Sequence, residues 1–182
     1  MACDITSGFT LGCRDNVGGI KNIYILSGSV SGVTADSGAI SDISGDGTFF
    51  KFELPRNVGD FTETPTPSLE NGTVFYTQTV NAAFHKLQAS IRNQVKVLAQ
   101  KPDVKIIVET ENGQDDGVGQ FFYVGRYRGA TLTGGSGATG TAFGDANQYA
   151  LTFEATEPYP SEEIEPTTKG DLSTALTGIT VG

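Results

Sequence analysis

The chain has 182 residues, of which 37% are hydrophobic and 24 are glycine, and its formal net charge is −9. This charge excludes a strongly basic surface of the kind that grips nucleic-acid phosphates. The length predicts a single domain, residues 1–182, whose core needs no metal or disulfide, and the glycine count favours turns and bulges of β structure over a helical bundle.

Residues 1–16 show no regular period and are expected to form an N-terminal arm. Residues 1–10 lack the basic and apolar stretches of a secretory signal, and no apolar run approaches the ~20 residues that cross a bilayer. We therefore expect synthesis in a cytoplasm and no membrane insertion of this chain. In that compartment Cys3 and Cys13 are most simply reduced thiols, with a disulfide as the alternative.

A β core is expected over residues 17–157. Residues 20–26 are β-branched and aromatic and predict a strand. Residues 30–47 are rich in Ser, Gly and Asp and predict a hairpin or a long β-rich loop. Residues 48–54 alternate cleanly and predict a strand that ends at Pro55.

The next segment predicts two extended stretches joined by a tight turn. Residues 61–67 contain two Thr-Pro steps, and a residue before proline is pushed out of the α region. Asn71-Gly72 is the best tight-turn signal in the chain, and it leads into a strand over residues 73–79.

One amphipathic helix is predicted over about residues 80–100. Its apolar residues recur at spacings of three and four, which places them on one stripe of a 3.6-residue helix. They are Val80, Phe84, Leu87, Ile91, Val95 and Leu98. Pro102 cannot continue a helix, so we expect the end near Lys101.

More strands follow the helix. Residues 104–110 and the aromatic stretch 121–127 predict strands, and residues 130–132 are expected to continue the second of these. The glycine-rich segment 134–144 predicts a flexible loop, and residues 148–156 alternate again. Residues 158–182 are expected to form an acidic C-terminal extension. The predicted fold class is mainly β, a sandwich or barrel with one central helix.

Residues for catalysis or metal binding are not apparent in the sequence. His85 is the only histidine, and no Cys, Asp or Glu lies one helical turn from it. The glycine cluster at residues 134–140 lacks the lysine and the context of a phosphate-binding loop. The acids near residues 115–116 lack the spacing of an EF-hand. We therefore expect no enzyme activity, no cofactor and no metal.

Acidic residues are distributed in blocks. From residue 129 to the end, seven acids accompany one base, Lys169, and between residues 23 and 50 there are three acids and no base. Those three are Asp36, Asp42 and Asp46. Blocks of one sign create a directional field, which is most simply a solvated face and alternatively the wall of an acidic channel.

The order of strands, central helix and further strands resembles the tail tube proteins of tailed bacteriophages and the inner-tube proteins of contractile injection systems. Two stretches also look like phage virion proteins, the opening MACDITSGFTLGCRDNVGGIKNIYI and the late GDANQYALTFE. The resemblance implies a ring, commonly a hexamer, whose sheets join around a lumen and whose rings stack into a tube. It implies a place in the virion tail, assembled in the host cytoplasm. The implied partners are further copies, other tail proteins and viral DNA that passes without specific binding.

Within that family, acidic lumens let DNA slide, so we expect Asp36, Asp42 and Asp46 to face inward. Candidates for ring-to-ring contact are Cys3, Asp4, Phe9 and Leu11 in the arm, with Gly134 and Gly135 in the predicted loop. One alternative is a neck, tail-terminator or head decoration protein. Another is a β-sandwich module that binds carbohydrate or protein through an exposed aromatic platform at residues 121–123.

Overall fold

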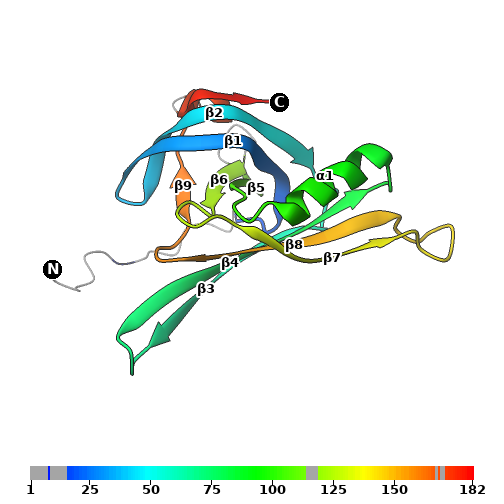
Figure 1. Ribbon diagram of the computed structural model, residues 1–182, viewed down its shortest axis with the longest axis horizontal. Helices are drawn as coiled ribbons and strands as arrows, with labels where there is room; N and C mark the ends of the chain where they lie inside the picture. The colour runs from blue at the N-terminus through cyan, green and yellow to red at the C-terminus, as the bar shows by residue number, and fades with distance from the viewer. Residues whose placement is uncertain (1–7, 9–15, 114–118, 167, 169–170) are drawn as a thin grey trace.

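Two β-sheets and one α-helix form the computed structural model of the chain, which describes residues 8, 16–113, 119–166, 168 and 171–182 (Figure 1). The six-stranded sheet has the order β1-β5-β6-β9-β2-β10, with an additional β1–β2 pairing. The four-stranded sheet has the order β3-β4-β8-β7. The predicted fold class, mainly β with one helix, is confirmed.

The six-stranded sheet closes on itself. Its strands are β1 (Ile20–Asp36), β2 (Ala39–Glu53), β5 (Ile106–Gly113), β6 (Gly119–Val124), β9 (Glu162–Ile164) and β10 (Leu176–Val181). β1 pairs with both β2 and β5, and β2 pairs with β9, so the ladder returns to its start. The predicted hairpin in residues 30–47 is confirmed as the distal part of β1 and β2.

The C-terminal residues belong to this sheet. After β9, a 3-10 helix (Leu172–Ala175) leads into β10, which runs parallel to β2. Ile164, Leu172 and Ile179 are buried in one apolar cluster with Phe49. The segment expected to be an acidic extension, residues 158–182, is therefore anchored to the core by its few apolar residues. The sequence did not indicate this because acidic residues outnumber basic ones in the segment.

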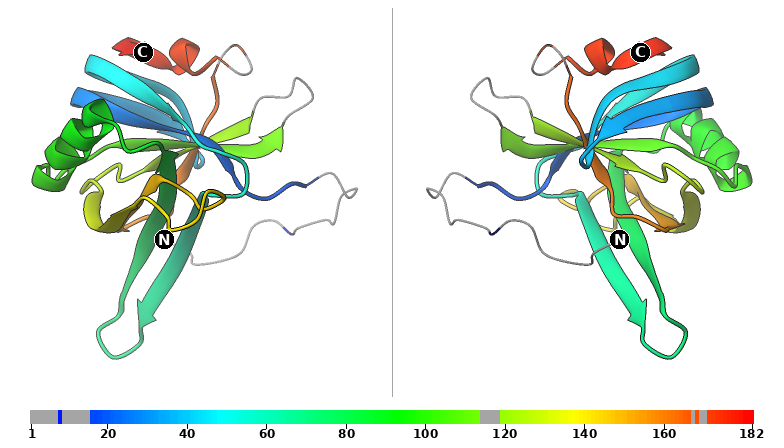
Figure 2. Two further views of the ribbon diagram at one scale, coloured as in Figure 1. Left: turned by 90° about the vertical axis from the view of Figure 1, so that its right-hand side faces the viewer. Right: turned by 90° about the vertical axis from the view of Figure 1, so that its left-hand side faces the viewer.

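The four-stranded sheet is antiparallel throughout. It contains β3 (Asp60–Ser68), β4 (Thr73–His85), β7 (Thr131–Ala138) and β8 (Gln148–Glu157). The predicted turn at Asn71-Gly72 is confirmed between β3 and β4. Beyond Tyr76, where the pairing of β4 with β8 ends, this hairpin projects from the body of the molecule (Figures 1 and 2).

The helix starts later than the sequence predicts. α1 spans Ala89–Gln100, whereas residues 80–85 are the end of β4, so the predicted start at Val80 is wrong. Val80 and Phe84 are four residues apart, a spacing that keeps side chains on one face of a strand as well as of a helix. Both are buried, with Ala82 between them. The predicted end before Pro102 is confirmed.

The glycine-rich segment is a strand at its start. β6 ends at Val124, and β7 begins in the other sheet, so the strand expected to continue through residues 130–132 is broken. Gly135 lies in β7, where a Cβ would stand 2.8 Å from Leu151 Cδ2. Glycine is present here because the side chains of β8 cover the strand, and the predicted loop is confined to residues 139–147.

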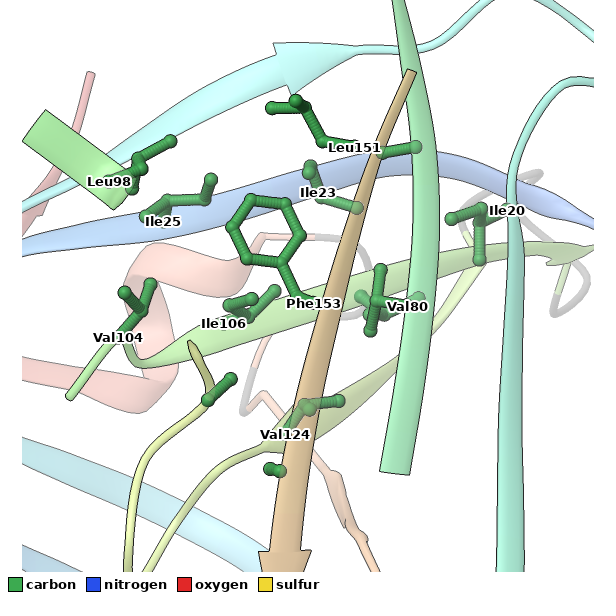
Figure 3. Packing of buried hydrophobic residues seen from close by; sticks show 14 of the residues in the cluster. Ile20, Ile23, Ile25, Val80, Leu98, Val104, Ile106, Val124, Leu151 and Phe153 are labelled. Carbon is green, nitrogen blue, oxygen red and sulfur yellow. The ribbon is translucent and has the colours of Figure 1, made fainter. Parts of the chain in front are cut away.

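The main core lies between the two sheets. Phe153 of β8 is fully buried and sits among Val80, Ile23 and Ile106 (Figure 3). α1 contributes Leu98, with Ile91 and Val95 packed more loosely against the same cluster. This packing fixes which face of the four-stranded sheet points inward and leaves the other to solvent.

Candidate assembly surface

The solvent face of the four-stranded sheet is the most distinctive surface of the molecule. In one row Phe61, Val80, Phe153 and Leu132 pair across the sheet and point toward the core. Side chains alternate along a strand, so the adjacent row points away from the core. That row is Thr62–Thr79–Glu154–Thr131.

Small, uncharged polar side chains dominate this face, which we call the threonine face. By the strand register it comprises Asp60, Thr62, Thr64, Thr77, Thr79, Asn81, Ala83, Thr131, Gly134, Ser136, Ala150, Thr152, Glu154 and Thr156. Of these, Ala83 shares the row but is itself buried. Neither lysine nor arginine occurs in these described rows, and the only charged residues are Asp60 and Glu154. The face is therefore neutral to acidic.

A ladder of hydrogen bonds crosses the threonine face. Asn81 Nδ2 donates to both carboxylate oxygens of Asp60, at 3.2 and 3.1 Å. Thr152 Oγ1 donates to Asn81 Oδ1 at 2.9 Å. The ladder connects β3, β4 and β8, so polar cross-strand contacts stabilise the face.

Both outer strands of this sheet have an open edge. In the part of the chain that the structure describes, no strand pairs with the outer side of β3 or of β7. An open edge presents unpaired backbone groups that can pair with another chain. Pro65 and Pro67 remove two donors from β3, which leaves its first half, residues 60–64, best suited to such pairing.

The sequence-predicted site residues lie elsewhere or at an edge. Asp36, Asp42 and Asp46 are on the β1–β2 hairpin of the other sheet, where Asp42 accepts a hydrogen bond from Thr177 Oγ1 at 2.7 Å. Their orientation toward a lumen stays a prediction. Gly134 and Gly135 lie in β7, at an open edge. The arm residues lie outside the described residues; they are Cys3, Asp4, Phe9 and Leu11.

The aromatic platform expected at residues 121–123 does not exist. Phe121 and Tyr123 are buried, and Phe122 stacks on Phe61 with ring centroids 6.2 Å apart. Burial raises the pKa of the Tyr123 hydroxyl. The prediction failed because both faces of β6 are covered. Phe121 and Tyr123 lie in one core cluster and Val124 in the other, so an aromatic side chain on either face is covered.

An exposed aromatic pair occurs at a different place. Tyr127 and Tyr159 are 48% and 58% exposed, with ring centroids 5.4 Å apart. They lie more than thirty residues apart in the sequence, so no local pattern indicates the pair. The threonine face, in contrast, is indicated in the sequence by the alternation of Thr62 with Thr64 in β3 and of Thr77 with Thr79 in β4.

The buried carboxylates serve the fold. Glu109 accepts hydrogen bonds from Asn22 Nδ2 at 2.6 Å and from the Tyr24 hydroxyl at 2.7 Å. Burial and the bond to Glu109 raise the pKa of Tyr24, which keeps the hydroxyl a neutral donor. Among the described residues, no three His, Cys, Asp or Glu side chains form a group that could hold a metal ion.

Comparisons with known proteins give no relatives: no family model, curated protein or solved structure matches the chain. No helix in the described ranges has the length and apolar character needed to span a membrane. A functional interpretation therefore depends on the geometry of the open-edged sheet and the chemistry of its solvent face.

Proposed function

We propose that this protein is a structural subunit of a phage tail tube, in which copies join edge to edge into a ring with the threonine face lining the bore. One observation carries the proposal: a four-stranded antiparallel sheet is open at both edges and bears a solvent face without lysine or arginine in its described rows. The resemblance of the sequence to phage tail tube proteins also implies a ring.

The directions of the edge strands suit a closed ring. Three antiparallel steps separate β3 from β7, so the two edge strands run in opposite directions. Rotation about an axis along the bore preserves strand direction, and β3 of one copy then lies antiparallel to β7 of the next. The four-stranded sheet then continues from copy to copy, and closure of the ring removes both of its open edges.

The chemistry of the face suits the passage of DNA. A double helix carries one negative charge per about 1.7 Å of axis, and it adheres to lysine and arginine. A bore lined by threonine, asparagine and serine offers weak, neutral contacts, while Asp60 and Glu154 repel phosphate. The net charge of −9 acts in the same direction.

This proposal places the bore on a different sheet from Asp36, Asp42 and Asp46, which were expected to line it. It also moves Gly134 and Gly135 from ring-to-ring contact to the contact within a ring, because both lie in β7. A role of the N-terminal arm in stacking remains part of the proposal.

Two alternatives predict different assemblies. A neck, tail-terminator or head decoration protein would form isolated rings or small oligomers. A carbohydrate-binding module would remain a monomer, and the exposed pair Tyr127 and Tyr159 is the observation in its favour.

Negative-stain microscopy and native mass spectrometry of the purified full chain separate these possibilities. Long hollow filaments, or rings that stack at higher concentration, are the expected result. A monomer at every concentration would contradict the proposal.

A further inference from the structure

We infer that an exposed corner beside β7 is the receptor for the projecting hairpin of a second copy. The corner, called here the aromatic corner, consists of Arg126, Tyr127, Arg128 and Tyr159. The hairpin arm is residues 66–75, the part of β3 and β4 beyond the end of β8. The inference rests on the proposed ring and names a contact that holds neighbouring copies together.

The backbone of the aromatic corner is fixed by a buried acid. Glu157 is 1% exposed, and its carboxylate accepts the backbone N–H groups of Tyr127 at 3.2 Å and Arg128 at 2.8 Å. A buried carboxylate is tolerated when it is fully hydrogen-bonded, and here it holds two residues whose side chains remain in solvent.

The loop beneath the corner has further constraints. Gly129 N–H donates to the Gly125 carbonyl at 3.1 Å, and Lys105 Nζ donates to the carbonyls of Gly125 and Arg126 at 2.9 and 3.3 Å. A Cβ on Gly129 would stand 2.2 Å from Asp103 Oδ1. The corner is therefore presented in one conformation, which lowers the entropic cost of binding a partner.

The side chains that the corner presents are those that dominate protein interfaces. Tyr127 and Tyr159 form the exposed pair. Arg126 is mostly buried and ion-paired with Glu162, and its guanidinium supports the Tyr127 ring from 4.9 Å. Arg128 is exposed beside them. Tyrosine and arginine are enriched among the residues that contribute most binding energy.

The strand register places the corner in the path of the arm. β7 begins at Thr131, level with Glu154, and Glu157 lies three residues further toward the end from which the arm projects, level with Tyr76. When β3 of a second copy lies antiparallel beside β7, its residues beyond 64 run past this end of the sheet. The arm of the second copy then meets the aromatic corner.

The hairpin arm has the complementary chemistry. Leu69 is 98% exposed, Val74 50% and Phe75 39%, and Glu70 lies beside Leu69 at the turn. A two-stranded hairpin alone is marginally stable in water, so the arm gains from a partner that covers these side chains. The two tyrosines offer apolar cover, and Arg128 offers a charge opposite to that of Glu70.

Paired charge variants test the contact. Arg128→Glu with Tyr127→Ala should lower the fraction of assembled rings by about tenfold at fixed concentration. In the full chain, Arg128→Glu combined with Glu70→Arg should recover assembly relative to Arg128→Glu alone. Arg92→Glu on the exposed side of α1 is the matched control and should assemble like the unmodified protein. Native mass spectrometry and microscopy measure assembly, and circular dichroism establishes that each variant is folded.

A cross-link gives a second readout that does not depend on loss of assembly. With Cys3→Ser and Cys13→Ser as background, Leu69→Cys and Tyr127→Cys should form a disulfide between copies on oxidation. Rings that assemble normally in Arg128→Glu/Tyr127→Ala, or an absent cross-link in intact rings, would overturn the inference and leave the proposed ring standing. An unmodified chain that stays monomeric would overturn both.

Discussion

The Glu157 carboxylate and the Arg128 backbone N–H are 2.8 Å apart, although 29 residues separate them in the chain. The bond joins the end of β8, in the four-stranded sheet, to the loop that leaves the six-stranded sheet after β6. It therefore ties the end of β8 to the loop that follows β6. Stability and the presentation of the aromatic corner depend on the same residue.

Replacement of this acid should be costly. Glu157→Ala leaves the N–H groups of Tyr127 and Arg128 without their acceptor, and we expect the free energy of unfolding to fall by about 2–3 kcal/mol. Urea unfolding of the monomer measures the change. Glu154→Ala, three residues earlier on the solvent side of β8, should change stability by less than about 0.5 kcal/mol. Equal effects of the two substitutions would contradict the role given to Glu157.

Two adjacent glycines of β7 should respond in opposite ways to alanine. At Gly135 a Cβ would stand 2.8 Å from Leu151 Cδ2 and 2.9 Å from the Ala150 carbonyl oxygen, so Gly135→Ala should destabilise the fold by about 1–3 kcal/mol. At Gly134 nothing lies within 4 Å, so Gly134→Ala should stabilise the strand by about 0.5–1 kcal/mol. Thermal unfolding of both variants is the measurement, and a stabilised Gly135→Ala would show that β7 is not covered as described.

The sequence predicts where the strands lie better than it predicts which strands pair with one another. Alternation and turn residues locate β2, β3, β5 and β8, and the Thr-Pro steps indicate an extended β3. The spacing of Val80 and Phe84 fits both a strand and a helix, and only the burial of both in the core cluster that contains Phe153 decides between them. Local pattern cannot resolve such a choice, because the deciding contacts are long-range.

The candidate site was harder to predict for the same reason. The acids at Asp36, Asp42 and Asp46 stand out in the sequence because no base interrupts them. The threonine face is assembled from four strands that span residues 60–157, and its character is visible only when the register is known. Gly134 looks like a loop residue until its pairing with Thr152 is seen.

The pKa of Asp145, in the exposed loop between β7 and β8, should be set by the hydrogen bonds that its carboxylate accepts. The backbone N–H groups of Ala142 and Thr141, each 2.7 Å from Asp145 Oδ2, hold the pKa of this carboxyl below its ordinary value. A lowered pKa in the folded state means that the stabilisation is present above the ordinary aspartate pKa. It is lost as the pH falls through the lowered pKa.

Carbon-detected NMR titration of the Asp145 carboxyl measures this shift. The amide signals of Thr141 and Ala142 should move with the same midpoint, because their hydrogen-bond acceptor is the group that titrates. Asp145→Asn should abolish that movement while the pH response of the rest of the chain is unchanged. A midpoint at or above the ordinary aspartate value would contradict the arrangement.

Lysine on the threonine face should make the proposed bore bind DNA that would otherwise pass through it. Thr79 and Glu154 are adjacent in one row, so Thr79→Lys with Glu154→Lys adds three positive charges to each copy at the proposed bore. A ring multiplies this change, and assembled particles should then retain double-stranded DNA at ~50 mM salt and release it by ~200 mM. Filter binding of purified assemblies measures retention.

A comparison variant places lysine at Asp36, Asp42 and Asp46 on the β1–β2 hairpin, which adds six positive charges to each copy, twice the change made on the threonine face. If the threonine face lines the bore, this triple variant adds charge outside the path of DNA and should not slow its passage. If the hairpin variant retained DNA and the threonine-face variant did not, Asp36, Asp42 and Asp46 would line the lumen instead of the threonine face. Strong retention by both would show that net charge alone, rather than the lining of a bore, decides whether DNA adheres.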